Sequence, residues 1–206
     1  MTARFDPRGV LVALQRREVD FILIGGLARV ARGADEITQG VDICPSLQPI
    51  NLGRLQAALL DLGALGPEVA KAPPFQHVYD EARLRAEQVV SLATTGGKLR
   101  LVAQPAGVPR GFEALRVGAT NEHLGNGLRI EVAATADLIT MAAALGRDVD
   151  LQRLPALRRI LKLETDRAAL VTPQARRTPT PQEVTQARTA ARRREGRGGS
   201  DPGVGR

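Results

Sequence analysis

The stretch that decides the fold is DFILIGGLARVARGADEITQGVDICPS, residues 20–46. It opens with DFILIGG, a short apolar run that stops at two glycines, which is typical of a buried strand followed by a tight turn. LARVARG, residues 27–33, predicts a short helix, and GVDICPS, residues 40–46, predicts a second strand that Pro45 closes. We therefore expect a strand, a helix and a strand in close succession.

The second predicted strand contains one carboxylate, Asp42, between Val41 and Ile43. Side chains alternate between the two faces of a strand, so Asp42 shares its face with Gly40 and not with its apolar neighbours. Two carboxylates at this spacing would present two metal ligands together, whereas this chain supplies one. The strand alone leaves open whether Asp42 is the remainder of a metal site or an ordinary surface aspartate.

Composition limits the class of protein. The chain has 206 residues, of which 43% are hydrophobic and only 2% aromatic, so aliphatic side chains must fill the core. Cys44 is the one cysteine, which excludes an internal disulfide framework, and we expect it to be buried and inert. We find no apolar run of about 18 residues and no signal-peptide pattern, so we expect a cytoplasmic, bacterial-type protein without a membrane span.

Further helices and strands are predicted along the chain. Helices are expected at 7–19, 50–63, 135–146 and 150–164, and strands at 87–93, 98–104, 116–124 and 128–134. Asn51 and Thr135 are the expected N-caps of two of these helices, and Gly125–Gly127 the turn of a hairpin. The predicted fold class is α/β (α+β), with a mixed β-sheet flanked by helices.

The C-terminal segment differs from the rest of the chain. From 175 to 206 it holds eight arginines against three acids, out of a total net charge of +7. It has too few large apolar residues to offset the entropy of ordering, so we predict a domain at 1–170 and a disordered basic tail at 171–206. The tail is either only solubilising or makes weak nucleic-acid contacts through its densest arginines, Arg192, Arg193, Arg194 and Arg197.

The order of these motifs resembles the minimal nucleotidyltransferase-like proteins, which include the AbiEii/AbiGii-type abortive-infection toxins. Their signature is a strand ending in Gly-Gly, a short helix and then Asp-x-Asp on the next strand, and Gly25, Gly26 and Asp42 match it. GGKLRLVAQPAG, residues 96–107, is similar to the strand that carries the family's third carboxylate. DLITMAAALGRDVDLQRLPAL, residues 137–157, is similar to a helix–loop–helix of the family.

The resemblance implies a nucleotidyltransferase-like fold and a nucleotide site at the Gly-Gly turn. In the family, carboxylates hold magnesium, and backbone amides of the turn approach the phosphates. By this resemblance Gly25, Gly26 and Thr38 are the candidate nucleotide-binding residues. A place in a toxin–antitoxin or phage-defence system, with a protein partner, is implied in the same way.

The chain departs from the family pattern where metal would bind. Gly40 occupies the slot of the first aspartate, Arg100 that of the third carboxylate, and Ala142 that of a basic residue on a following helix. One carboxylate of three, Asp42, is left, so we expect no bound metal and read Asp42 as a relic. We predict instead a direct contact between Asp42 and Arg100, close to the Gly25–Gly26 turn, in which the guanidinium replaces the cation.

Three functions follow from these observations. The leading hypothesis is a catalytically degenerate nucleotidyltransferase-fold protein that acts as a nucleotide-binding or protein-interaction module. The first alternative is an active, magnesium-dependent nucleotidyltransferase that modifies RNA or protein by using Asp42 with an unexpected acid, such as Glu131 or Asp137. The second is a protein that associates with nucleic acid through its basic tail.

Other polar residues have structural explanations. Arg147 and Asp150 are predicted to form an ion pair between helices. His77 and His123 have no acid or cysteine at metal-ligand spacing, so we expect them to be ordinary surface or loop residues.

Overall fold

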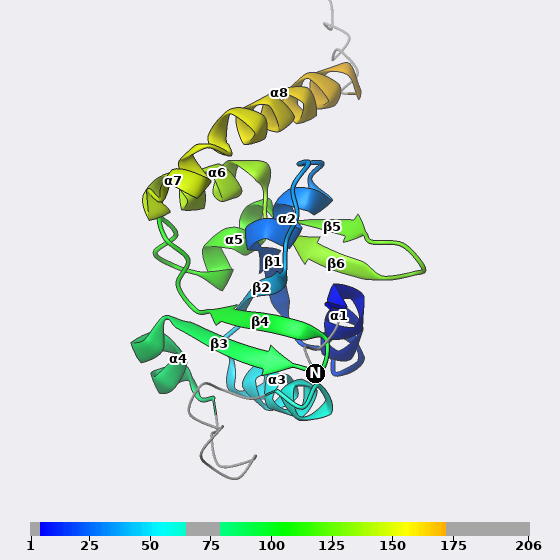
Figure 1. The fold of residues 1–206 in the computed structure, drawn as a ribbon, viewed down its shortest axis with the longest axis vertical. Coiled ribbons are helices and arrows are strands. Elements are labelled where there is room, and N and C mark those ends of the chain that lie inside the picture. Colours follow the sequence, from blue (N-terminus) through cyan, green and yellow to red (C-terminus); the bar gives the residue numbers. More distant parts are fainter. Residues whose placement is uncertain (1–4, 65–78, 172–206) are drawn as a thin grey trace, which may run out of the picture. The chain divides into compact units, whose positions relative to one another are not determined.

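The computed structural model describes residues 5–64 and 79–171, and its centre is one six-stranded sheet (Figure 1). The strands are β1 (Phe21–Ile24), β2 (Gly40–Pro45), β3 (Val89–Thr94), β4 (Gly97–Val102), β5 (Thr120–His123) and β6 (Arg129–Val132). They lie in the order β3-β4-β2-β1-β6-β5.

The sheet is mixed. Its two outer pairs, β3–β4 and β5–β6, are antiparallel hairpins, and β1 is antiparallel to β2. The central strands join these hairpins through parallel pairs, β2 with β4 and β1 with β6. The predicted fold class is confirmed, as is the hairpin around Gly125–Gly127.

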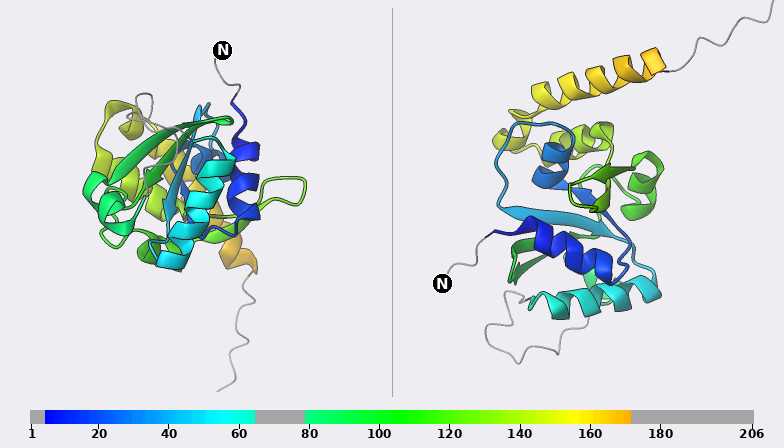
Figure 2. Two further views of the ribbon diagram at one scale, coloured as in Figure 1. Left: turned by 90° about the horizontal axis from the view of Figure 1, so that it is seen from below. Right: turned by 90° about the vertical axis from the view of Figure 1, so that its right-hand side faces the viewer.

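Helices cover both faces of the sheet (Figures 1 and 2). On one face lie α1 and α3, and on the other α2, α5 and α6. The bounds are α1 (Pro7–Arg16), α2 (Gly25–Ala31), α3 (Pro49–Asp61), α4 (Glu81–Glu87), α5 (Phe112–Gly118), α6 (Thr135–Leu145), α7 (Asp148–Leu151) and α8 (Leu154–Val171). Because both faces are covered, all four side chains of β1 are buried.

Local signals explain how the first helix forms. Asp6 caps α1, because its carboxylate accepts a hydrogen bond from the backbone N–H of Gly9 at 2.9 Å. Val10, Leu11 and Leu14 follow at helical spacing and are buried against the sheet and α3.

The two predicted N-caps are wrong. Gln48 precedes α3, whereas the Asn51 side chain is buried, accepts from the backbone N–H of Asp20 and donates to the carbonyls of Asp20 and Ser46. Thr135 is the first helical residue of α6, and its hydroxyl donates to Glu164 at 2.9 Å. In both cases a long-range polar partner outcompetes the local backbone donor.

Two short helices were not expected. EARLRAE forms α4, and FEALRVG forms α5, which takes residues 116–118 from the strand predicted at 116–124. Seven residues provide fewer than two full turns of periodic pattern, so tertiary packing of Leu84 and Leu115 decides these helices.

The compact unit that contains the sheet ends at Glu164. The described part of the following unit is the end of α8. The tail was predicted at 171–206, and from 172 onward, with all eight of its arginines, it lies outside the described residues. His77 lies outside them as well. None of the helices described is long and apolar enough to span a membrane.

An exposed ion pair joins the ends of α1 and α3. Arg17 donates from Nε and Nη2 to the carboxylate of Asp61, at 2.7 and 2.8 Å. The hydrogen bond from Arg17 lowers the pKa of Asp61 in the folded chain, so the pair stabilises the fold above the unfolded pKa of about 4.

We expect that contribution to be lost as pH falls through the lowered pKa. In Arg17→Gln, an NMR titration of Asp61 should show its pKa moving upward, toward the ordinary value. An unchanged titration of Asp61 in that variant would contradict the pairing.

Candidate functional site

The candidate site lies where β2 and β4 run parallel beside the start of α2. In their register, Asp42 of β2 lies directly opposite Arg100 of β4, and Gly40 lies opposite Lys98. On the other side of β2, Asp42 pairs with Ile24, the last residue of β1 before the Gly25–Gly26 turn. Ile24, Asp42 and Arg100 are distant in sequence, and they meet here because β1, β2 and β4 are paired in this register.

Asp42 and Arg100 form a bidentate ion pair. Nε of Arg100 donates to Oδ1 of Asp42 at 2.5 Å, and Nη2 donates to Oδ2. The carboxylate is buried, with 6% of its side chain exposed, whereas 36% of the Arg100 side chain is exposed. The predicted contact is thus confirmed, in the geometry that suits a planar guanidinium.

The ion pair shifts the titration of the arginine. The hydrogen bonds with Asp42 raise the pKa of Arg100, partial burial opposes that rise, and the charges of Asp42 and then Asp150 add to it. Arg100 therefore stays cationic over the whole physiological range.

The Gly-Gly turn provides the space that the Asp42 carboxylate fills. Gly25 has φ +68°, and a Cβ there would lie 2.0 Å from Oδ2 of Asp42. A Cβ on Gly26 would lie 2.8 Å from the hydroxyl of Thr38, which itself donates to the carbonyl of Gly40 at 3.1 Å. The chain's own Asp42 and Thr38 thus cover both glycines, and side chains at these positions would collide with them.

Further arginines and carboxylates lie near this pair, and the charge of one of them, Asp150, acts on Arg100. Glu36 accepts from Arg29 of α2 and from Arg153, each at 2.8 Å. Arg153 also lies 3.9 Å from Asp150, a buried carboxylate that Arg147 binds at 2.5 Å. The predicted Arg147–Asp150 ion pair is confirmed, and we call the seven residues Arg29, Glu36, Asp42, Arg100, Arg147, Asp150 and Arg153 the arginine–carboxylate network.

The network fits an anion better than a cation. Its three carboxylates, Glu36, Asp42 and Asp150, are each bound to at least one arginine. Four guanidinium groups face three carboxylates, and the side chains of Arg100 and Arg147 are partly exposed. No group of three His, Cys, Asp or Glu suited to a metal ion occurs in the described ranges, 5–64 and 79–171.

The remaining sequence candidates lie elsewhere. Glu131 is on β6, in a pocket at the opposite end of β1, and Asp137 is in the first turn of α6, where burial raises its pKa. His123 is exposed at the end of β5. Cys44 is fully buried, and burial raises the pKa of its thiol to about 12, which makes it unreactive at neutral pH.

Three network residues, Arg29, Glu36 and Arg153, were not singled out from the sequence. Arg29 is on the short helix of the fold-deciding stretch, seven residues before its partner Glu36, so local spacing could have indicated it. Arg153 reaches Glu36 from the segment between α7 and α8, and no local pattern signals such a contact.

Comparison with known proteins gives a limited result. No family model and no curated protein matches the chain. Among solved structures, the chain is similar to the crystal structure of a "putative nucleotidyltransferase" from Thermotoga maritima, with 15% sequence identity over 79% of this chain and 89% of that chain. The TM-score is 0.40, so the two backbones differ too much for site residues to be transferred position by position.

Proposed function

We propose that the chain is a catalytically degenerate protein of the nucleotidyltransferase-like type, which binds a nucleotide through arginines in place of metal ions. The observation that supports the proposal is the bidentate Asp42–Arg100 pair across β2 and β4. Transfer chemistry of this kind depends on divalent ions that neutralise charge on the phosphates. A guanidinium bound to Asp42 removes the carboxylate from metal binding and repels the cation.

The network also supports an anionic ligand. The side chains of Arg100 and Arg147 are partly exposed, and guanidinium groups suit phosphate oxygens. Gly25, Gly26 and Thr38 border this cluster of charges, but Asp42 and Thr38 cover the two glycines. The phosphates are therefore proposed to bind beside the turn, on the exposed parts of Arg100 and Arg147. From the family resemblance we further propose a cytoplasmic role in a toxin–antitoxin or phage-defence system, beside a partner protein.

A transfer assay tests the catalytic part of the proposal. Labelled nucleoside triphosphates are incubated with the chain, with magnesium or manganese, and with cellular RNA and protein. We expect no labelled product. Transfer by the unmodified chain that Asp42→Ala abolishes would establish the active-enzyme alternative instead.

Restoring acids should create a metal site. A Cβ on Gly40 would lie 3.4 Å from the carbonyl oxygen of Lys98, so an aspartate fits there with at most a small adjustment. In Gly40→Asp with Arg100→Asp, three carboxylates would face one another, and we expect calorimetry to show Mn²⁺ binding at least about tenfold tighter than in the unmodified chain.

The matched control is Gly40→Asp with Arg110→Asp. It changes the net charge by the same amount, but the second acid lies on an exposed residue away from the site, and Arg100 stays bound to Asp42. We expect this control not to gain Mn²⁺ affinity. Equal binding by both double variants would show that Arg100 does not exclude the metal.

A further inference from the structure

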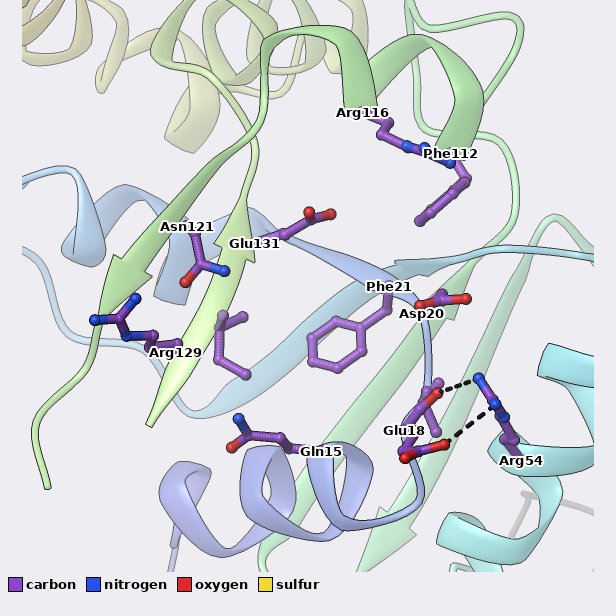
Figure 3. A pocket seen from close by; sticks show the side chains of 12 residues that line it. Gln15, Glu18, Asp20, Phe21, Arg54, Phe112, Arg116, Asn121, Arg129 and Glu131 are labelled. Carbon is purple, nitrogen blue, oxygen red and sulfur yellow. Dashed lines mark hydrogen bonds and ion pairs between the residues drawn. The ribbon is translucent and has the colours of Figure 1, made fainter. Parts of the chain in front are cut away.

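A second candidate site lies at the other end of β1. An open pocket of about 590 Å³ borders the turn before β1, the helices α3 and α5, and the β5–β6 hairpin (Figure 3). Its volume is in the range of pockets that bind small molecules. Because the Asp42–Arg100 pair is next to the last residue of β1 and this pocket next to the first, the two sites are separate.

Apolar side chains lie beneath the pocket. Phe21, Phe112 and Ile130 border it but are nearly completely buried by the surrounding core. In Figure 3 the ring of Phe21 lies in the middle of the lining side chains, with Gln15 and Glu18 on one side and Glu131 on the other. A ligand in this pocket therefore meets mainly polar groups and touches only small areas of these apolar side chains.

The rim carries both signs of charge. Glu18 is neutralised by Arg54, at 3.1 Å. In contrast, four other charged residues of the rim form no side-chain ion pair with any residue that the structure describes. They are Arg116, Arg129, Asp20 and Glu131. Two cationic and two anionic groups around this pocket are thus left without an ion-pair partner among the described residues.

The hairpin places some of these groups together. Asn121 and Glu131 are cross-strand partners, and Arg129 is two residues before Glu131, so the three side chains share one face. The Asn121 amide adds a donor and an acceptor between a carboxylate and a guanidinium. The Glu131 carboxylate can bind an ammonium group of a ligand, the Asn121 amide a peptide group, and the Arg129 guanidinium a carboxylate.

We propose that this pocket binds a short zwitterionic peptide of dipeptide size. Its carboxylate binds Arg129, its ammonium binds Glu131, and its peptide group binds the Asn121 amide. A simple anion would be repelled by the two acids, and a simple cation by the two arginines. A ligand with both charges suits both kinds of group.

The test is an NMR titration of the unmodified chain with the nine dipeptides formed from alanine, leucine and phenylalanine. The side-chain amides of Asn121 and Gln15 report directly on the pocket. We expect saturable shifts of these signals with at least one dipeptide. The N-acetylated and C-amidated forms of that dipeptide, which each lack one charge, should bind at least about tenfold more weakly.

Variants separate this pocket from general effects. Arg129→Gln and Glu131→Gln should each weaken the dipeptide by about tenfold, whereas the exposed controls Arg110→Gln and Glu113→Gln, outside the pocket, should not. Arg100→Met should leave this binding unchanged, because it alters the other site. The proposal is overturned if no dipeptide shifts these signals, or if the singly charged forms bind as tightly as the zwitterion.

Discussion

Gly25→Ala should lower the free energy of unfolding by more than about 3 kcal/mol. Two effects add at this position. A side chain at φ +68° costs about 1–2 kcal/mol, and the new methyl group would lie 2.0 Å from Oδ2 of Asp42. The carboxylate must then move, which breaks its bidentate contact with Arg100 and leaves buried charge without its partner. Urea unfolding measures the change.

Gly33→Ala is the matched control for that experiment. Gly33 also has a positive φ, +97°, but a Cβ there would have no atom within 4 Å. This control therefore contains the backbone strain without the collision, and we expect it to cost about 1–2 kcal/mol. Equal costs for the two variants would mean that the Asp42 carboxylate does not lie against Gly25.

Arg100→Met should destabilise the fold by about 3 kcal/mol, more than Asp42→Asn does. Methionine keeps much of the aliphatic stem, so the change removes mainly the charge. It leaves the Asp42 carboxylate buried and uncompensated, which is the costly way to break an ion pair. After Asp42→Asn, by contrast, the guanidinium is partly exposed and can be hydrated, so we expect a cost of about 1–2 kcal/mol.

The double variant Arg100→Met with Asp42→Asn completes the cycle. Because the two residues are in direct contact, we expect it to cost less than the sum of the single changes by at least about 1 kcal/mol. Additive effects, or an Arg100→Met variant as stable as the unmodified chain, would show that the pair contributes nothing.

The centre of the site could be predicted from the sequence because it follows from strand alternation. Val41 and Ile43 fix the face of Asp42, and Leu99 and Leu101 fix that of Arg100, so parallel pairing in register brings the two charges together. Their contact beside the Gly-Gly turn was predicted and is found.

The rest depends on tertiary packing that local patterns do not encode. Arg153 joins the network from 117 residues beyond Glu36, and only the placement of the segment between α7 and α8 makes that contact. Asn51 was read as a cap because that residue type favours caps, but burial beside Asp20 and Ser46 gave it other partners. Phe112 and Arg116 line the pocket of Figure 3 from α5. This helix has seven residues, too few for its sequence pattern to predict it.

The most direct test of a guanidinium in place of a metal is calorimetric titration of the unmodified chain with ATP, in excess EDTA and in excess magnesium. ATP without magnesium carries more negative charge, so arginines alone should bind it at least as tightly as the magnesium complex. We therefore predict an equal or lower Kd in EDTA, and weaker binding after Arg100→Met. ATP binding that appears only with magnesium and is lost in Asp42→Asn would contradict the replacement of the metal by a guanidinium. No ATP binding in either condition would contradict the proposed nucleotide site.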